Sequence, residues 1–286
     1  MSKIADALVR SYDVRPVEIT RIHAGTVTTN FRVTDDDGGE WFAKVYRDRS
    51  LRPDELAAVE LAEFARSDQV PVPGVRRTCA GKLIDDAFPM SLWNYVDDSE
   101  TAESGLTGKR WPAVGTVLGN LHRRLADHPA ATPAMRPGTG VRDIARSRFD
   151  RLISEYNRRG TPFEQWCLDA AEQRRDLLDH AVDILARLPD LTTQVVHGDL
   201  ASPNLLLRGD KVAAVIDFQS PNPRFLSWEL ARIGCDPRTI LLGDQWLTGL
   251  PELLAAYASR TPPSTSTTSS PSPRSAAPTP SRRPTH

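Results

Sequence analysis

The sequence has few cysteines, no long apolar run and no excess of charge of either sign. Its three cysteines, Cys79, Cys167 and Cys235, are far apart and form no Cys-x-x-Cys pair, which argues against a structural zinc site and is typical of free thiols in a reducing compartment. No apolar run approaches membrane-spanning length, and the first residues lack the apolar core of a secretory signal. The formal net charge of -1 indicates neither a nucleic-acid-binding protein nor an acidic tail. We therefore expect a cytoplasmic protein without a nucleic-acid or membrane partner.

The 286 residues are enough for a sizeable core and for two lobes. Alternating and β-prone apolar residues predict strands at 17–23, 30–34, 41–46, 83–84 and 88–96. Apolar residues at helical spacing predict helices at 4–12, 54–66, 111–125, 141–159, 163–188 and 250–257. Their expected core faces include Ile144, Leu152 and Leu177. The distribution of strands and helices indicates an α+β protein.

The composition changes abruptly at Arg260, beyond which Thr, Pro, Ser and Arg predominate up to His286. Nothing in this segment is apolar enough to be buried, so residues 259–286 are expected to form a disordered tail. A truncated or frame-shifted end and a dispensable tail are both compatible with this composition.

The most informative stretch is Val195–Leu207, which reads VVHGDLASPNLLL and is followed by VIDF at 215–218. It supplies a carboxylate on a loop, Asp199, and an amide five residues later, Asn204. A second carboxylate, Asp217, ends the following short strand. Phosphoryl transfer requires such a trio, because one group must hold the attacking hydroxyl and two must hold magnesium.

A β-hairpin is expected to bring these three side chains together. The runs LLL and VAAVI are β-prone and are separated by the turn-forming residues RGDK. A hairpin folded about that turn sets Asn204 opposite Val215, and therefore close to Asp217 on the neighbouring strand. Asp199, on the loop that leads into the hairpin, then lies over the same point. Carboxylate and amide oxygens suit a hard cation such as Mg²⁺, which keeps sites for phosphate and water.

The pattern His-Gly-Asp-x4-Asn followed by Ile-Asp-Phe resembles the aminoglycoside phosphotransferase superfamily, which includes choline kinases and type II homoserine kinases. That family has the protein-kinase-like fold and the Asp-x4-Asn spacing of the kinase catalytic loop. The resemblance implies ATP and Mg²⁺ as cofactors, Asp199 as the catalytic base, and Asn204 and Asp217 as magnesium ligands. It also implies that His197 supports the catalytic loop.

The resemblance assigns further nucleotide-binding residues in the N-terminal part. Lys44, in the third strand, would bind the α- and β-phosphates of ATP, and a glutamate of helix 54–66 would pair with it. Glu60 is the preferred partner and Glu55 is the alternative. The loop between the first two strands, with Gly25 and Thr28, would cover the phosphates, although it lacks the GxGxxG pattern of protein kinases.

Three further features of the sequence carry less specific expectations. By the same resemblance, the backbone near Asn94 and Val96 would contact adenine at the hinge between the lobes. The acidic run that follows (Asp97, Asp98, Glu100 and Glu103) would attract a cationic acceptor, but a solvated linker is the favoured interpretation. Glu229 is expected to order either the catalytic loop or an arginine, and His122 is expected to be a packed structural histidine.

Together these patterns predict a two-lobed, kinase-like α+β enzyme, with an N-lobe at 1–95 and a C-lobe at 96–258. The expected activity is transfer of the ATP γ-phosphate to a hydroxyl of a small molecule. An aminoglycoside or other natural product is as good a candidate acceptor as an amino acid or amino alcohol such as homoserine or choline. The alternative is a non-catalytic, nucleotide-binding pseudokinase. The sequence does not decide between a monomer and a dimer.

Overall fold

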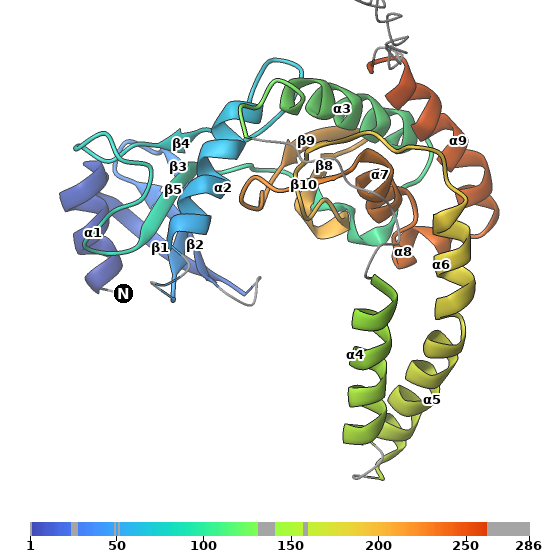
Figure 1. The fold of residues 1–286 in the computed structure, drawn as a ribbon. Coiled ribbons are helices and arrows are strands. Elements are labelled where there is room, and N and C mark those ends of the chain that lie inside the picture. Colours follow the sequence, from blue (N-terminus) through green and yellow to red (C-terminus); the bar gives the residue numbers. More distant parts are fainter. Residues whose placement is uncertain are drawn as a thin grey trace, which may run out of the picture.

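The computed structural model describes residues 2–23, 28–48, 50, 52–130, 141–156 and 160–261. Gly25 and residues 262–286 of the tail predicted at 259–286 lie outside these residues. The first part of the chain forms an antiparallel sheet with the strand order β1-β2-β3-β5-β4. The strands are β1 (Pro16–Ile22), β2 (Thr28–Asp35), β3 (Glu40–Tyr46), β4 (Val75–Arg76) and β5 (Met90–Asn94). Two helices, α1 (Ser2–Tyr12) and α2 (Arg52–Ala65), accompany this sheet (Figure 1).

The turn between β2 and β3 is locked by one aspartate. The Asp35 carboxylate accepts hydrogen bonds from the Gly39 N–H at 2.5 Å and from the Trp41 indole at 2.7 Å. Gly38 has a φ of 78°, a left-handed conformation that glycine adopts without steric cost. This hairpin fixes β3 in the middle of the sheet, where Lys44 pairs with Asn30 of β2 and Ser91 of β5.

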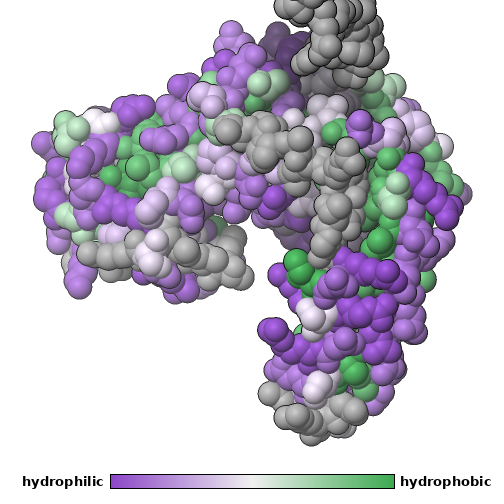
Figure 2. Space-filling model, in the orientation of Figure 1, coloured by the Kyte–Doolittle hydropathy of each residue, from purple (hydrophilic) through white to green (hydrophobic). Residues whose placement is uncertain are grey.

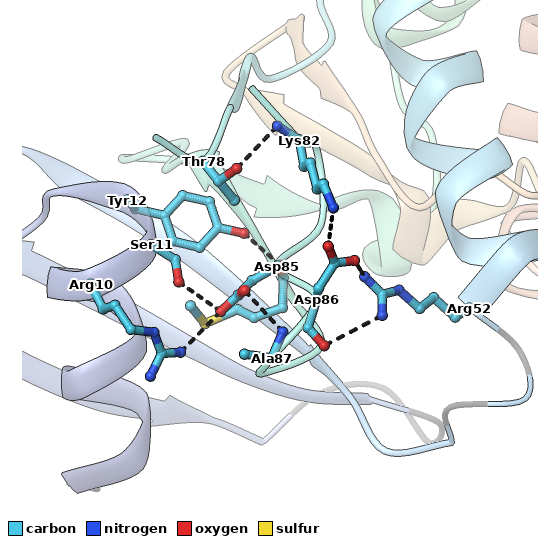
Figure 3. Close-up of polar contacts among 10 residues, drawn as sticks. Arg10, Ser11, Tyr12, Arg52, Thr78, Lys82, Asp85, Asp86 and Ala87 are labelled. Atoms are coloured by element: carbon cyan, nitrogen blue, oxygen red, sulfur yellow. Dashed lines mark hydrogen bonds and ion pairs between the residues drawn. The ribbon is translucent and has the colours of Figure 1, made fainter. Parts of the chain in front are cut away.

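Both helices of this lobe are tied to the loop before β5 (Figure 3). Asp85 accepts hydrogen bonds from Ser11 of α1 at 2.8 Å and from Arg10 at 3.4 Å. The neighbouring Asp86 forms ion pairs with Arg52 of α2 and with Lys82. The loop therefore takes the place of the short strand predicted at 83–84, although the two side chains of that run are buried as expected.

The remainder of the chain is mainly helical, as predicted. Its helices are α3 (Arg110–Leu125), α4 (Val141–Tyr156), α5 (Pro162–Asp176), α6 (Leu178–Ala186), α7 (Leu226–Gly234), α8 (Pro237–Ile240) and α9 (Asp244–Ala258). Its strands are β6 (Glu100–Thr101), β7 (Thr193–Val195), β8 (Leu205–Arg208), β9 (Lys211–Val215) and β10 (Pro223–Phe225). They form a three-stranded sheet, β6-β8-β9, and a two-stranded pair, β10-β7.

Helices α3 and α9 approach closely because α3 carries glycine at the contact. A Cβ at Gly115 would lie 2.1 Å from the Leu253 carbonyl oxygen, and one at Gly119 would lie 2.8 Å from that of Tyr257. The main core includes buried residues of both helices, Trp111 and Leu253 among them. This packing fixes the relative position of two helices that support the candidate site.

Helices α4, α5 and α6 project from the body of this lobe, and their visible surface is largely hydrophilic (Figures 1 and 2). The predicted core residues Ile144, Leu152 and Leu177 are 57%, 39% and 61% exposed, so that expectation was wrong. Among the described residues, the core clusters include no residue of these three helices, so helical spacing of apolar residues does not indicate burial here. The long helix predicted at 163–188 is also divided at Leu177, where the backbone stays near-helical (φ −78°, ψ −10°). No glycine or proline marks this division in the sequence.

Among the described residues, no helix combines the length and the apolar character needed to span a membrane.

Candidate functional site

The hairpin that was predicted to carry the site is present, but its register differs by one residue. Leu205 pairs with Val215 because the ladder shifts between Leu206 and Leu207. Asn204 therefore lies opposite Ile216, whose N–H donates to the Asn204 carbonyl oxygen at 3.0 Å, and not opposite Val215 as expected. A bulge inserts one extra residue on one strand, which sequence spacing alone does not reveal. The shift places Asn204 beside the residue that immediately precedes Asp217.

Asn204 is bonded directly to the loop that carries Asp199, residues 196–201, which is called the catalytic loop below after its predicted role. Its side-chain amide nitrogen donates to the Asp199 carbonyl oxygen at 2.7 Å and lies 3.3 Å from the Asp199 carboxylate oxygen Oδ2. The amide oxygen of Asn204 accepts no hydrogen bond from the described residues. The structure therefore brings Asp199 and Asn204 together. The amide oxygen of Asn204 remains available as a ligand for a metal ion.

Steric constraints explain why the central residue of the His-Gly-Asp motif is a glycine. Gly198 has a φ of 90°, and a Cβ at this position would lie 2.8 Å from the Cβ of Gln219. The Gln219 N–H also donates to the His197 carbonyl oxygen at 3.0 Å. Only glycine allows the segment after Asp217 to approach the catalytic loop this closely.

His197 is fully buried and connects the loop to the hairpin. Its Nε2–H donates to the Ile216 carbonyl oxygen at 2.9 Å, and its Nδ1 accepts the Asp199 N–H at 3.2 Å. These partners require the neutral imidazole with the proton on Nε2. Burial lowers the pKa of His197 below its usual value, against the opposing effect of Glu229.

The lowered pKa of His197 predicts a pH-dependent stability. Below about pH 6.5 the unfolded chain binds a proton at this histidine that the folded chain excludes, so the free energy of unfolding should fall as the pH drops. Urea unfolding at several pH values measures this slope, which should be shallower in His197→Gln. His180→Gln removes an exposed histidine of α6 and should keep the parental slope; equal slopes in all three chains would contradict the assignment.

Glu229 anchors the catalytic loop through hydrogen bonds to its backbone. Its carboxylate accepts the N–H groups of His197 at 3.1 Å and Gly198 at 2.8 Å, and the Nε2–H of His122 at 2.9 Å. Tyr257 of α9 donates its hydroxyl to His122 Nδ1 at 2.9 Å, and burial raises the pKa of Tyr257 to about 12. Glu229 therefore orders the loop, one of the two roles expected for it, and His122 is the packed structural histidine that was predicted.

Arg232 is a site residue that the sequence analysis missed. Its guanidinium forms an ion pair with the Asp199 carboxylate oxygen Oδ1 and lies 5.2 Å from the Trp228 ring. Arg232 stands three residues after Glu229 on α7, a spacing that puts both side chains on one face of a helix. Once Glu229 is placed at the loop, that spacing would have identified Arg232.

Lys44 reaches across from the N-terminal sheet to the hairpin. Its Nζ lies 2.5 Å from Asp217 Oδ1, and Asp217 has a φ of 64°, a conformation uncommon outside glycine. Glu55 is partly buried nearby: burial raises its pKa, helped by the Asp217 charge and opposed by Lys44. Glu60 is exposed, and no ion pair joins it to Lys44 in the described part of the chain. The structure therefore brings Glu55, and not the preferred Glu60, into the field of Lys44.

The other residues predicted to contact the nucleotide differ in whether their polar groups are free to bind it. Thr28 is buried and donates its hydroxyl to Asn30 Oδ1 at 3.0 Å. The Asn94 N–H is used in a 2.9 Å hydrogen bond to the Gly74 carbonyl oxygen. The Val96 N–H has no acceptor among the described residues, and its carbonyl oxygen accepts the Ser99 hydroxyl at 3.0 Å. Of the two residues predicted to lie at the hinge, Val96 is the one whose backbone N–H is free of an acceptor among the described residues.

The donor set at the hairpin fits a magnesium ion. Asn204 offers its amide oxygen, and Asp217 offers a carboxylate that is 46% exposed. Within the described residues there is no cluster of three or more His, Cys, Asp or Glu side chains that would hold a metal by themselves. Two oxygen ligands with remaining sites for phosphate and water are what Mg²⁺ usually takes in phosphate-binding sites.

Comparison with known sequences gives a family and several distant relatives. The model of a family described as the phosphotransferase enzyme family matches residues 18–263. A homoserine kinase of Pseudomonas aeruginosa is 26% identical over 272 residues, covering 90% of this chain and 77% of the relative. A homoserine kinase of Zymomonas mobilis subsp. mobilis is 23% identical over 233 residues, covering 76% of this chain and 64% of the relative. The chain thus spans less than two thirds of the length of the Zymomonas protein.

Comparison with solved structures supports the fold. A spectinomycin phosphotransferase in complex with ADP and spectinomycin matches with a TM-score of 0.64 and 16% identity, covering 88% of this chain and 79% of that chain. The predicted two-lobed, kinase-like α+β fold is therefore confirmed.

Proposed function

This chain belongs to the phosphotransferase enzyme family, and from that premise we propose that it transfers the γ-phosphate of ATP to a hydroxyl of a small molecule. One observation carries the proposal. A loop aspartate, Asp199, is bonded to Asn204, whose backbone is bonded to the residue before Asp217, and Lys44 from the other lobe contacts Asp217. These groups together have the arrangement that phosphoryl transfer requires.

In the proposed reaction, Asp199 orients the acceptor hydroxyl and accepts its proton. A bond forms between the acceptor oxygen and the γ-phosphorus, the bond from that phosphorus to the β–γ bridging oxygen breaks, and ADP leaves. Lys44 steadies the α- and β-phosphates. Asn204 and Asp217 would hold magnesium, which when bound neutralises the phosphate charge.

For the acceptor, the proposal specifies the reacting group, a hydroxyl, and leaves the rest of the molecule open to test. The relatives named above are homoserine kinases, and the structural neighbour holds spectinomycin. Two classes of acceptor are therefore tested. One is the hydroxyl of an amino acid or amino alcohol, and the other is the hydroxyl of an aminoglycoside or other natural product. The comparisons provide no support for the non-catalytic alternative.

The direct test is ADP formation by the purified chain with ATP and magnesium, with homoserine, choline or an aminoglycoside added separately. The proposal expects ADP formation that depends on one of these acceptors. Tight ATP binding with no acceptor-dependent ADP formation by any small hydroxyl compound would favour the non-catalytic protein instead.

Replacement of Lys44 by Ala should weaken use of the nucleotide. A charge-assisted hydrogen bond contributes about 1.5–3 kcal/mol, so kcat/KM for ATP should fall by about 10- to 100-fold. Steady-state kinetics with ATP as the varied substrate measures this loss. Lys82→Ala is the matched control, because Lys82 also pairs with an aspartate but lies in the loop before β5. An equal effect of both changes would exclude a specific role for Lys44.

A further inference from the structure

A pocket of about 330 Å³ opens beside the catalytic carboxylate. Its lining comes from the catalytic loop and from the segment that follows Asp217: Gly198, Asp199, Gln219, Ser220, Asn222 and Arg224. Apart from Asp199, the only charged side chain among these lining residues is Arg224. An acceptor whose hydroxyl reaches Asp199 from this pocket meets that guanidinium.

Arg224 is fixed by the fold. It lies on β10, paired with Gln194 of β7, the strand that leads into the catalytic loop. Its Nη1 donates to the Asn222 side-chain oxygen at 3.0 Å, and its guanidinium lies 5.8 Å from the Trp228 ring. No carboxylate of the described residues forms an ion pair with it. Arg224 therefore presents a held cation, with unused N–H donors, at the pocket.

The second arginine near the pocket, Arg232, already has a carboxylate partner. Arg232 lies against the same Trp228 ring, but its charge is already paired with Asp199. Arg224 and Arg232 thus both lie near the Trp228 indole, and of the two only Arg224 has no carboxylate partner in the described part of the chain. A guanidinium is planar and has N–H groups in a fork that matches a carboxylate.

The acidic run at 97–103 does not provide a site for a cation instead. Three of its carboxylates are paired with arginines: Asp97 with Arg208 at 2.8 Å, Glu100 with Arg110 at 2.6 Å and Glu103 with Arg238 at 3.5 Å. None of them lines the pocket. The described residues around the catalytic carboxylate therefore match an anionic acceptor better than a polycation.

We propose that Arg224 binds a carboxylate of the acceptor, so that the substrate is a small molecule bearing both a hydroxyl and a carboxylate. Asp199 takes the hydroxyl, and Arg224, which also lines the pocket, takes the carboxylate. This assignment rests on the proposed phosphotransferase function and specifies its acceptor class.

The test compares acceptors that differ only in the carboxylate. L-Homoserine is paired with 3-aminopropan-1-ol, and L-serine with ethanolamine; choline, an aminoglycoside and glycerol phosphate complete the panel. The parent chain should use an acid with a kcat/KM at least about tenfold above that of its partner. Arg224→Gln should raise KM for that acid by about 10- to 100-fold, with kcat and the KM for ATP little changed.

Two variants control for indirect effects. Arg224→Lys retains a charge but not the fork and should restore part of the lost affinity. Arg208→Gln removes an exposed arginine of β8 that pairs with Asp97 and should leave the acid preference unchanged.

Each other outcome is decisive. Preference for choline, the aminoglycoside or the partners without a carboxylate would overturn the carboxylate assignment while leaving the phosphotransferase function intact. Preference for glycerol phosphate would replace the carboxylate by a phosphate, and an acid preference retained in Arg224→Gln would exclude Arg224. No transfer to any member of the panel would contradict the proposed function itself, and this assignment with it.

Discussion

Replacement of Asp199 by Asn is expected to lower kcat for phosphoryl transfer by about 10²- to 10⁴-fold, the range for loss of a general base. The physical reason is that an amide cannot accept the proton of the acceptor hydroxyl. Asn204 bonds mainly to the backbone oxygen of Asp199, so the loop retains its 2.7 Å hydrogen bond in the variant. The Kd for ATP should therefore stay within a few-fold of the parental value. Single-turnover kinetics and calorimetric ATP binding measure the two quantities separately.

The matched control is Asp210→Asn, which changes an exposed aspartate in the turn of the same hairpin. That chain should keep full activity. If Asp199→Asn retained turnover within a few-fold of the parent, Asp199 would not be the base. If it lost activity and ATP binding together, the effect would be on the structure of the site rather than on proton transfer.

Replacement of Glu229 by Leu should produce the largest loss of stability. The side chain is 0% exposed and accepts three N–H donors, two from the catalytic loop and one from His122. An apolar side chain leaves those donors buried without partners, which costs about 3–5 kcal/mol of unfolding free energy. For a chain of this size the unfolding temperature should fall by on the order of 10 °C.

Two isosteric changes from Glu to Gln sharpen this test. Glu229→Gln keeps the shape but lacks the charge, so it should lose less stability than the leucine variant. Glu252→Gln changes an exposed glutamate of α9 and should stay within about 0.5 kcal/mol of the parent. If the unfolding temperatures of all three variants agreed within error, Glu229 would not hold the loop.

Glu229 also predicts how the protein responds to acid. Burial opposes its ionisation, but the hydrogen bonds that its carboxylate accepts from His122 and from the Gly198 N–H outweigh burial and lower its pKa. The stabilisation is therefore present above the unfolded value of 4.5 and is lost as the pH falls through the lower folded value. In Glu229→Gln this loss below about pH 4.5 should be smaller, as urea unfolding at acidic pH would measure.

The sequence predicted the part of the site that depends on local spacing. Asp199, Asn204 and Asp217 lie on one loop and one hairpin, so the turn composition is enough to bring them together. It did not predict the bulge, because an unbroken apolar run such as VAAVI does not show which residue is left unpaired. Arg232 was missed because it lies 33 residues from Asp199, and its spacing from Glu229 identifies it only once packing has placed Glu229 at the loop. Such long-range contacts depend on packing, which no local pattern contains.

The same limit explains the preference for Glu60. Helical periodicity places several glutamates on α2, but the rotation of that helix against the sheet decides which one approaches Lys44. In the structure Lys44 acts electrostatically on the partly buried Glu55, whereas Glu60 is exposed. Similarly, Ile144 had the spacing of a core residue, yet it lies on α4, which projects from the lobe (Figure 1), and it is 57% exposed.

The most direct test of the central claim follows the phosphate itself. ATP labelled at the γ-phosphate is incubated with the chain, magnesium and the acceptor panel, and the labelled products are identified for the parent and for Asp199→Asn. We predict that the parent places the label on an acceptor hydroxyl and that the variant does so at least about 100-fold more slowly. Label found only in inorganic phosphate, or transferred equally fast by both chains, would contradict the assignment of this hairpin and loop as a phosphoryl-transfer site.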